Sequence, residues 1–404
     1  MISVDEALSR LLALLTPVGA EQVALADAFG RVLAEDVAAR RTQPPAALSA
    51  MDGYAVRAAD VTSIPARLRV VGSVPAGKSH SGLIRPGEAV RIFTGAPLPE
   101  GTDAIVIQED TDRDGDWVAV REAAPKGNYV RPAGLDFSAG TVGIKAGKRL
   151  TARDIGLAAA MDRPWLMVRR KPRVAIIATG DEVVMPGDPV GPNQIVSSNS
   201  LALGAVVHAC GAEALQLGIA ADDLGSLRSV AEGAGGADLL VTTGGASVGE
   251  HDLVRDALAT TGLTLDFWTI AMRPGKPLMV GRFRDAVMVG LPGNPVSSLV
   301  CALIFLKPAI EHLSGLDTSE APAATARLAI PLAANDRRQD YLRATLRRGA
   351  DGALEAIPFA KQDSSMLSLL AQSDCLVIRP PHAPPAKAGD AVNIIPLGGQ
   401  TFSV

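Results

Sequence analysis

The sequence predicts a multidomain α/β plus β protein, built around a doubly wound, mostly parallel α/β domain. An inserted all-β domain, a discontinuous helical or mixed N-terminal domain and a C-terminal β domain complete the prediction. The first basis is length, because 404 residues at ~150 per domain fill two to four domains. The second is composition, since 48% hydrophobic and 20% charged residues build large cores. The third is a change of hydrophobic period along the chain.

The N-terminal domain is predicted to comprise residues 1–42 and 140–171. Val4–Leu15 has helical spacing with acidic residues in its first turn. Glu21–Ala39 is expected to be mostly helical, interrupted at Gly30, and Thr151–Met161 returns to helical spacing. These three helices are expected to form one domain.

Residues 43–139 form the predicted β insert, in which Gly and Pro separate short runs of β-type residues. The expected strands are Leu68–Val71, Ala89–Phe93, Ala104–Ile107 and Trp117–Val120.

Residues 172–318 form the predicted α/β domain, because strands alternate with helices there. The expected strands are Val174–Ala178, Ala214–Gly218, Ala237–Thr242, Leu278–Val280 and Ala286–Val289. The expected helices are Asn199–Cys210, Leu224–Glu232, Asp252–Thr261 and Val296–Leu313. Residues 319–404 form the predicted C-terminal β domain, with strands near Arg327–Ile330, Tyr341–Thr345 and Cys375–Ile378.

Charge and cysteine usage exclude several classes of protein. A net charge of −4 gives no general attraction to nucleic acid or anionic membranes. The three cysteines, far apart in apolar runs, are expected to be buried hydrophobes in a reducing compartment. The start lacks a basic segment and cleavage site, and Leu299–Phe305 is shorter than the ~18 residues that span a bilayer. A cytoplasmic location without membrane contact is therefore expected.

The strongest candidate for a binding site is Thr242–Asp252, because ligands bind at the carboxyl ends of parallel strands. Its glycines permit close approach of a ligand, and Ser247 adds a hydroxyl. Glu250 and Asp252 fit beside an anion if a divalent cation mediates. The alternative is a plain strand-to-helix turn with Asp252 as N-cap.

Two further strand ends and one basic turn lie nearby in the predicted sheet. At Ala178–Glu182 the acids are either helix caps or ligands, and Gly290–Pro295 is either a rigid turn or a backbone anion site. Arg273–Pro277 is either a solvated hairpin tip or a phosphate clamp, and the adjacent loops favour the clamp.

Other reactions are disfavoured by the absence of their motifs. The five histidines form no HxxxH or HxH pattern, so no zinc site is expected. No Walker motif, GxSxG elbow or HExxH is present, which disfavours P-loop phosphoryl transfer and serine hydrolysis. The polar turns of the insert, around Asp52, Thr94 and Asp136, are individually ordinary turn signals.

Seven segments in order along almost the whole chain resemble the molybdenum insertase family MoeA, which is related to the gephyrin E domain. They are Ser49–Ala55, Phe93–Pro99, Pro172–Glu182, Ser198–Ser200, Gly244–Asp252, Pro274–Pro277 and Gly290–Ser297. The resemblance implies a molybdopterin-binding α/β domain and insertion of molybdate into adenylylated molybdopterin, with Mg²⁺-dependent release of AMP. It also implies a homodimer, held in part by the N-terminal domain, with the site between subunits.

The resemblance also implies functional residues. The catalytic set is Asp52, Thr94, Asp136, Glu182, Asp222 (or its neighbour Asp223) and Asp252. Glu182, Asp222 and Asp252 would serve Mg²⁺, and the insert would contribute its three residues across the dimer interface. The substrate-binding set is Thr179, Gly180, Gly244, Gly245, Ser247, Arg273, Lys276, Pro292, Asn294, Pro295, Arg343 and Ser364, or Ser365 in its place. Within it, Arg273, Lys276 and Arg343 would hold molybdate or the terminal phosphate, and Ser247 the pterin phosphate.

Three positions depart from the family pattern. Thr269 and Arg273 stand where lysine is usual, and Leu135 where glutamate is common. These changes bear on oxyanion affinity, and the preference for molybdate over tungstate stays open. Two alternatives remain: a molybdopterin adenylyltransferase and a non-catalytic scaffold like gephyrin. The adenylyltransferase of the same pathway and acceptor molybdoenzymes are the further partners implied.

Overall fold

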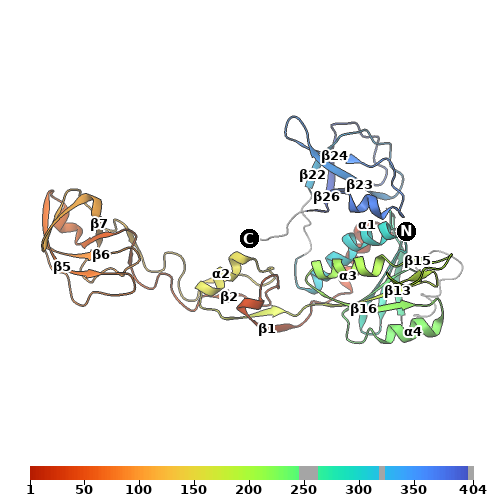
Figure 1. The fold of residues 1–404 in the computed structure, drawn as a ribbon, viewed down its shortest axis with the longest axis horizontal. Coiled ribbons are helices and arrows are strands. Elements are labelled where there is room, and N and C mark those ends of the chain that lie inside the picture. Colours follow the sequence, from red (N-terminus) through yellow and green to blue (C-terminus); the bar gives the residue numbers. More distant parts are fainter. Residues whose placement is uncertain (245–262, 318–323, 399–404) are drawn as a thin grey trace.

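The computed structural model describes residues 1–244, 263–317 and 324–398. In Figure 1 the β insert lies at one end of an elongated molecule, and the α/β and C-terminal domains lie at the other. The segment that carries α2 (Ala152–Ala160) lies between them. The insert is therefore remote from the α/β domain of its own chain.

A six-stranded sheet forms the α/β domain and confirms the predicted fold class. Its order is β16 (Glu213–Ala220), β13 (Arg173–Thr179), β17 (Leu239–Thr243), β21 (Ala286–Leu291), β20 (Pro277–Phe283) and β18 (Leu263–Thr269). The first four strands are parallel, and β20 runs antiparallel to both of its neighbours, β21 and the edge strand β18. Helices α3 (Asn199–Ala209) and α4 (Leu224–Glu232) match two predicted helices, and the predicted helix Asp252–Thr261 lies outside the described residues. Residues 174–179 are all buried, as expected for a strand covered on both faces.

The helix after β21 is the core helix of this domain. It begins as α6 (Pro295–Cys301), passes through a π-helical segment (Ala302–Leu306) and ends as α7 (Lys307–Leu313). The whole element, 19 residues, is long and apolar enough to cross a membrane, which exceeds the apolar stretch predicted from sequence. Because 61% of it is buried inside the molecule, the core of a folded domain accounts for its composition.

The first helix, which the sequence groups with the N-terminal domain, packs against the α/β core. In α1 (Val4–Ala13) the buried residues are Val4, Ala7 and Leu11. They share one hydrophobic cluster with α7 and the sheet. The periodicity predicted the helix correctly, but it carries no information about which domain covers the apolar face.

The segment predicted as helical at Glu21–Ala39 is instead mostly extended. It contains β1 (Ala20–Ala24), a single 3₁₀ turn (Leu25–Asp27) and β2 (Val37–Ala38). β1 pairs along its whole length with β12 (Trp165–Arg169), and β2 pairs with β11 (Val142–Ile144). Tertiary strand pairing therefore overrides the local helical pattern.

The insert is the β domain that the sequence predicts. Its sheet has the order β7 (Ala104–Ile107), β4 (Gly53–Val56), β6 (Glu88–Ile92), β5 (Ala66–Val74), β9 (Trp117–Val120) and β8 (Thr111–Asp114). Tyr54 and Val56 join one apolar cluster and Ala55 another, as the alternation of a strand covered on both faces requires.

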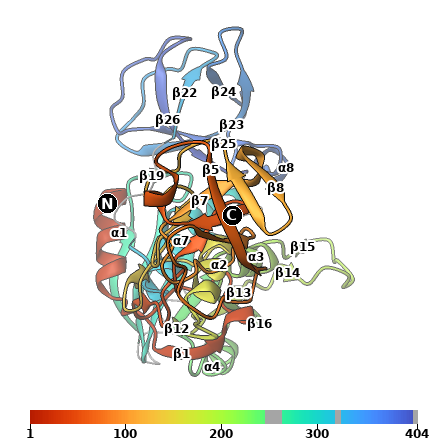
Figure 2. The same cartoon turned by 90° about the vertical axis from the view of Figure 1, so that its left-hand side faces the viewer.

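The C-terminal domain is a small barrel that stands on the α/β domain, with α8 (Leu367–Ala371) at the junction (Figure 2). The strands that close it are β23 (Gln339–Arg348), β24 (Leu354–Pro358), β22 (Ala324–Leu328), β26 (Ala391–Pro396) and β25 (Cys375–Arg379). β25 pairs with both β26 and β23 and so closes the ring. β19 (Met272–Arg273), from the α/β domain, adds to β23 in parallel. One strand of this sheet thus comes from outside the predicted range 319–404.

Candidate functional site

A cleft of about 620 Å³ lies at the carboxyl ends of β13, β17 and β21. This is the edge of a parallel sheet at which ligands bind in open α/β folds. Its lining combines three strand-end loops, the start of α3, the short strands β14 (Val183–Val184) and β15 (Ile195–Val196), and one residue of the C-terminal domain, Ser365. Of the predicted substrate-binding residues, the cleft is lined by Thr179, Gly244, Pro292, Asn294 and Pro295, and Glu182 of the catalytic set joins them.

Close packing of two of these loops requires glycine at position 244. Gly244 has a φ of +94°, and a Cβ there would lie 2.4 Å from the backbone oxygen of Thr179. The loop after β21 packs directly against Gly244, since a Cβ on Gly293 would lie 3.5 Å from the Cα of Gly244. The three strand ends therefore form one continuous wall.

Thr179 carries a hydroxyl that the described residues leave unused. The residue is 2% exposed, and its Oγ1 has no hydrogen-bond partner within the described part of the chain. Buried polar atoms are normally paired, because burial without a partner costs free energy. Thr179 also lines the cleft, with its Oγ1 buried just behind the surface of the cleft wall.

Asn199 is a residue of the site that the sequence reasoning did not single out. It is the first residue of α3, and its Nδ2 donates to Thr243 Oγ1 at 2.9 Å and to the Gly293 carbonyl at 2.7 Å. The side chain thereby ties α3 to the two strand-end loops. Ser198–Ser200 stood among the seven resembling segments, so the signal was present, but nothing local indicated two partners so distant in sequence.

Two carboxylates, Asp181 and Asp222, lie close to Glu182, which lines the cleft. The Asp222 amide donates to Asp181 Oδ1 at 3.0 Å. Burial, followed by repulsion from Asp181 and Glu182, raises the pKa of Asp222 above its ordinary value. The Glu182 carboxylate folds against Gly180, where an added Cβ would lie 2.6 Å from Glu182 Oε2. Gly180 therefore leaves room for the acid predicted to act beside it.

The C-terminal domain reaches the cleft through the loop that contains Ser364 and Ser365. Asn294 Nδ2 donates to Ser364 Oγ at 3.1 Å, and the Val296 amide donates to the Ser364 carbonyl at 3.1 Å. Arg343, predicted to hold an oxyanion, is 1% exposed and lies behind this loop. Its Nη1 donates to the Met366 carbonyl at 3.1 Å and its Nε to Gln362 Oε1 at 3.3 Å, and burial lowers its pKa.

The two cations of the Pro274–Pro277 turn have different surroundings. Lys276 is exposed and directly precedes Pro277, which lines the cleft. Arg273 was predicted from sequence as a clamp for phosphate. Its guanidinium is instead bonded to Asp340 and ion-paired with Asp336, both in the C-terminal domain.

The catalytic residues predicted on the insert form a separate group. Asp52 Oδ1 accepts hydrogen bonds from the Thr94 amide at 2.7 Å and from the Thr94 hydroxyl at 2.8 Å, and these bonds lower the pKa of Asp52. Asp136 is exposed on the same domain. Figure 1 places the insert far from the α/β domain, so one chain does not unite these residues with the cleft. Gly245, Ser247 and Asp252 lie outside the described residues.

Comparison with known proteins gives matches along nearly the whole chain. Family models match residues 2–161 (MoeA N-terminal region, domains I and II), 175–312 (probable molybdopterin binding domain) and 325–397 (MoeA C-terminal region, domain IV). Molybdopterin molybdenumtransferase 2 of Mycobacterium tuberculosis is 37% identical over 92% of this chain and 94% of its own. Molybdopterin molybdenumtransferase of Nostoc sp. is 38% identical over 89% of this chain and 85% of its own.

A solved structure has the same overall architecture. The crystal structure of the molybdopterin biosynthesis moea protein from Pyrococcus horikosii superposes with a TM-score of 0.87 at 30% identity. The match covers 99% of this chain and 100% of that chain.

Proposed function

Because the chain belongs to the MoeA family of molybdopterin molybdenumtransferases, we propose that it inserts molybdate into adenylylated molybdopterin and releases AMP. The observation that carries the proposal is the cleft within the matched molybdopterin-binding domain. Its volume of about 620 Å³ lies within the ~300–1,000 Å³ of small-molecule sites. Its lining includes Thr179 and the closely packed Gly244, where the absence of a side chain suits close approach of a phosphate-bearing ligand.

In the proposed reaction the protein positions the substrates and supplies charge, and it does not supply a nucleophile. The dithiolene sulfurs of the pterin are themselves the ligands of molybdenum, so no protein thiol is needed. All three cysteines are free and buried, and burial raises the pKa of Cys210 and Cys375 to about 11. They serve the cores, as the sequence predicts.

Glu182 and Asp222 are the described residues that would hold Mg²⁺, together with Asp252 from outside the described range. Their oxygen donors suit this cation, and the pKa of Asp222, raised first by burial and then by repulsion from Asp181 and Glu182, would fall beside a bound cation. No group of three potential metal ligands is preformed within residues 1–244, 263–317 and 324–398. When bound, Mg²⁺ neutralises charge on the phosphoanhydride that is cleaved.

The oxyanion subsite in our proposal consists of Lys276 and Ser365. Lys276 is exposed beside the cleft, and Ser365 lines it. Arg343 acts through the loop, because its guanidinium contacts Gln362 and Met366 from the buried side. In this assignment Arg343 does not touch the oxyanion. It supports the loop that carries Ser364 and Ser365.

A second copy of the chain supplies Asp52, Thr94 and Asp136 in our proposal. The distance between the insert and the cleft in Figure 1 motivates it, since one chain leaves both groups incomplete. Exposed apolar side chains border both: Ile195 at the cleft and Leu135 beside Asp136 are each 60% exposed. A homodimer would cover such residues.

The test is incubation of the purified chain with adenylylated molybdopterin, molybdate and Mg²⁺. The expected result is AMP and molybdenum cofactor in equal amounts. The adenylyltransferase alternative is tested in parallel with molybdopterin and ATP, where no AMP transfer is expected. Transfer of AMP from ATP without AMP release in the first reaction would overturn the proposal. The scaffold alternative predicts no reaction in either arm.

A further inference from the structure

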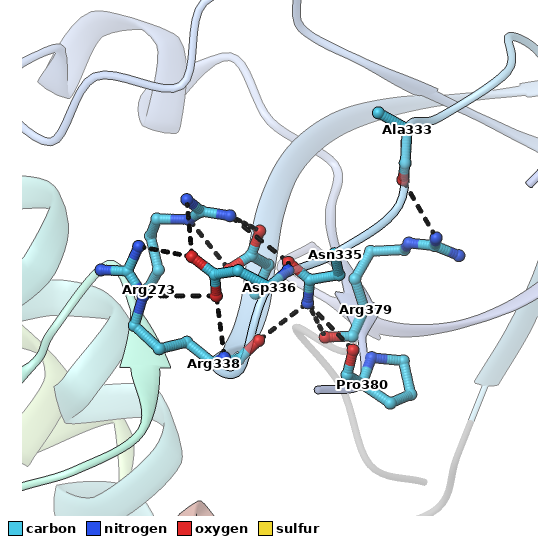
Figure 3. Close-up of polar contacts among 8 residues, drawn as sticks. Arg273, Ala333, Asn335, Asp336, Arg338, Arg379 and Pro380 are labelled. Atoms are coloured by element: carbon cyan, nitrogen blue, oxygen red, sulfur yellow. Dashed lines mark hydrogen bonds and ion pairs between the residues drawn. The ribbon is translucent and has the colours of Figure 1, made fainter. Parts of the chain in front are cut away.

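Arg273 is held by the C-terminal domain through Nε, Nη1 and Nη2 of its guanidinium (Figure 3). Nε donates to Asp340 Oδ1 at 2.9 Å, and Nη2 donates to Asp340 Oδ2. Nη2 also contacts Asn335 Oδ1 at 3.3 Å, and Nη1 lies 3.6 Å from Asp336 Oδ2. The contact is bidentate, and it joins the buried carboxylate of Asp340, whose side chain is 7% exposed, to an arginine whose side chain is 47% exposed.

Hydrogen bonds of Asn335 hold in place the loop that contacts Arg273. Asn335 Nδ2 donates to the carbonyls of Arg338, Arg379 and Pro380 at 2.8, 3.0 and 2.9 Å, which ties two loops of the barrel together (Figure 3). The backbone contributes as well, because β19 pairs with β23 and the Gln339 amide donates to the Ala271 carbonyl at 2.9 Å.

The charges of the cluster balance. Asp336 is also paired with Arg338 at 2.8 Å, so Arg273, Arg338, Asp336 and Asp340 together carry no net formal charge. An oxyanion gains little from a cation that two carboxylates already neutralise. Removing Arg273 from Asp340 to meet a ligand would also leave a buried carboxylate unpaired, which is costly.

Strand β23 connects this contact to the cleft. Asp340 lies near its start, and Arg343, on the same strand, contacts the loop that carries Ser364 and Ser365. Between the two polar contacts, Tyr341, Leu370 and Leu376 join the hydrophobic core of the α/β domain. The position of the C-terminal barrel relative to the α/β domain therefore determines where Ser365 lies in the cleft.

We infer that Arg273 is a positioning residue, which clamps the C-terminal domain onto the α/β domain through Asp340, and not a ligand of the oxyanion. Asp340 and Asn335 complete this clamp. The inference rests on the proposed function in one respect, namely that the cleft it shapes is the insertase cleft. Arginine, with its planar fork, makes a two-point contact at this position that lysine could not.

The clamp and the ligand interpretations predict opposite effects for Asp340→Asn. If Arg273 is a clamp, Asp340→Asn and Arg273→Gln each raise the KM for molybdate by about 10-fold, and the double variant is no worse than either. If Arg273 is a ligand, Asp340→Asn frees it and leaves the KM unchanged or lower, while Arg273→Gln alone raises it. The latter result would overturn the inference.

Hydrogen exchange of the purified full-length chain supplies a readout that needs no substrate. The clamp predicts faster exchange of the Val296 amide, which bonds the Ser364 carbonyl, in both single variants. Asp351→Asn is the matched control, because it breaks an exposed ion pair with Arg327 on the same domain, and unchanged exchange is expected. Unchanged exchange in Asp340→Asn would overturn the clamp even if the wild-type chain proved inactive, so the two proposals fail separately. Should Arg273→Gln not fold, Arg273→Lys provides the same comparison with the charge retained.

Discussion

Replacing Gly244 by alanine tests whether the close contact of two strand-end loops forms the cleft. The new Cβ would lie 2.4 Å from the Thr179 carbonyl oxygen and 2.9 Å from its Oγ1, and the φ of Gly244 is +94°. Placing a non-glycine residue at positive φ costs ~1–2 kcal/mol. Forcing packed backbone apart adds ~1–3 kcal/mol. The total expected loss of stability in the α/β domain is ~2–5 kcal/mol.

Gly218→Ala is the matched control, because Gly218 has a φ of +90° with nothing within 4 Å of an added Cβ. It should cost only the ~1–2 kcal/mol of backbone strain. Hydrogen exchange of the β13 and β17 amides measures the stability of this domain in each variant. Because Thr179 lies in the cleft wall, Gly244→Ala should also raise the KM for adenylylated molybdopterin, and Gly218→Ala should not. If both variants lost the same stability and the KM stayed unchanged, the close contact between Gly244 and Thr179 would not shape the cleft.

Three further predictions follow from single contacts. Asn199→Ala removes the donor to Thr243 and Gly293, so we expect a loss of ~1–3 kcal/mol by hydrogen exchange and a lower kcat. Exposed Asn393→Ala is its control, and an unchanged kcat in Asn199→Ala would contradict the bridge. Gln362→Ala leaves the buried Arg343 guanidinium without one acceptor, and faster exchange of loop 362–366 is expected; slower or equal exchange would show that Arg343 does not support the loop. The pKa of Asp222 is raised in the folded chain, so the native state holds its proton to higher pH than the unfolded state does, and stability falls as pH rises above the ordinary value of 3.8. Asp222→Asn should therefore be more stable than wild type at pH 7 and lose this advantage near pH 4, and Mg²⁺ should stabilise wild type more; a pH-independent difference would rule out a raised pKa of Asp222 in the folded chain.

The sequence predicts the α/β sheet well because its signals are local. Val174–Ala178 is apolar throughout, which is typical of a short strand buried on both faces. The glycines and acids at the strand ends are likewise visible, and topology alone brings Thr179, Gly244 and Asn294 to one edge. Fold and cleft position therefore follow from periodicity plus one rule about parallel sheets.

What the sequence does not predict depends on long-range partners. Glu21–Ala39 has a helical pattern, but pairing of β1 with β12, far along the chain, decides its conformation. The helix at Val4 was predicted, but its assignment to a domain needed the packing against α7. Arg273 was predicted to hold molybdate or the terminal phosphate, and its contact with Asp340 was not foreseen because Asp340 lies remote in sequence and in another predicted domain. Residue type indicates what a side chain can bind, and only the fold decides what it does bind.

The turn that presents Lys276 illustrates how a residue without chemistry can shape a site. Gly275 has a φ of +110°, and a Cβ there would lie 2.4 Å from the Sγ of Cys301 in the core helix. The thiol lies 3.8 Å from the Gly275 carbonyl and is fully buried, so it fills the space beneath the turn. A larger side chain at position 301 would push the turn outward, and with it the cation next to Pro277. Cys301 therefore supports the turn that carries Lys276 through its volume alone.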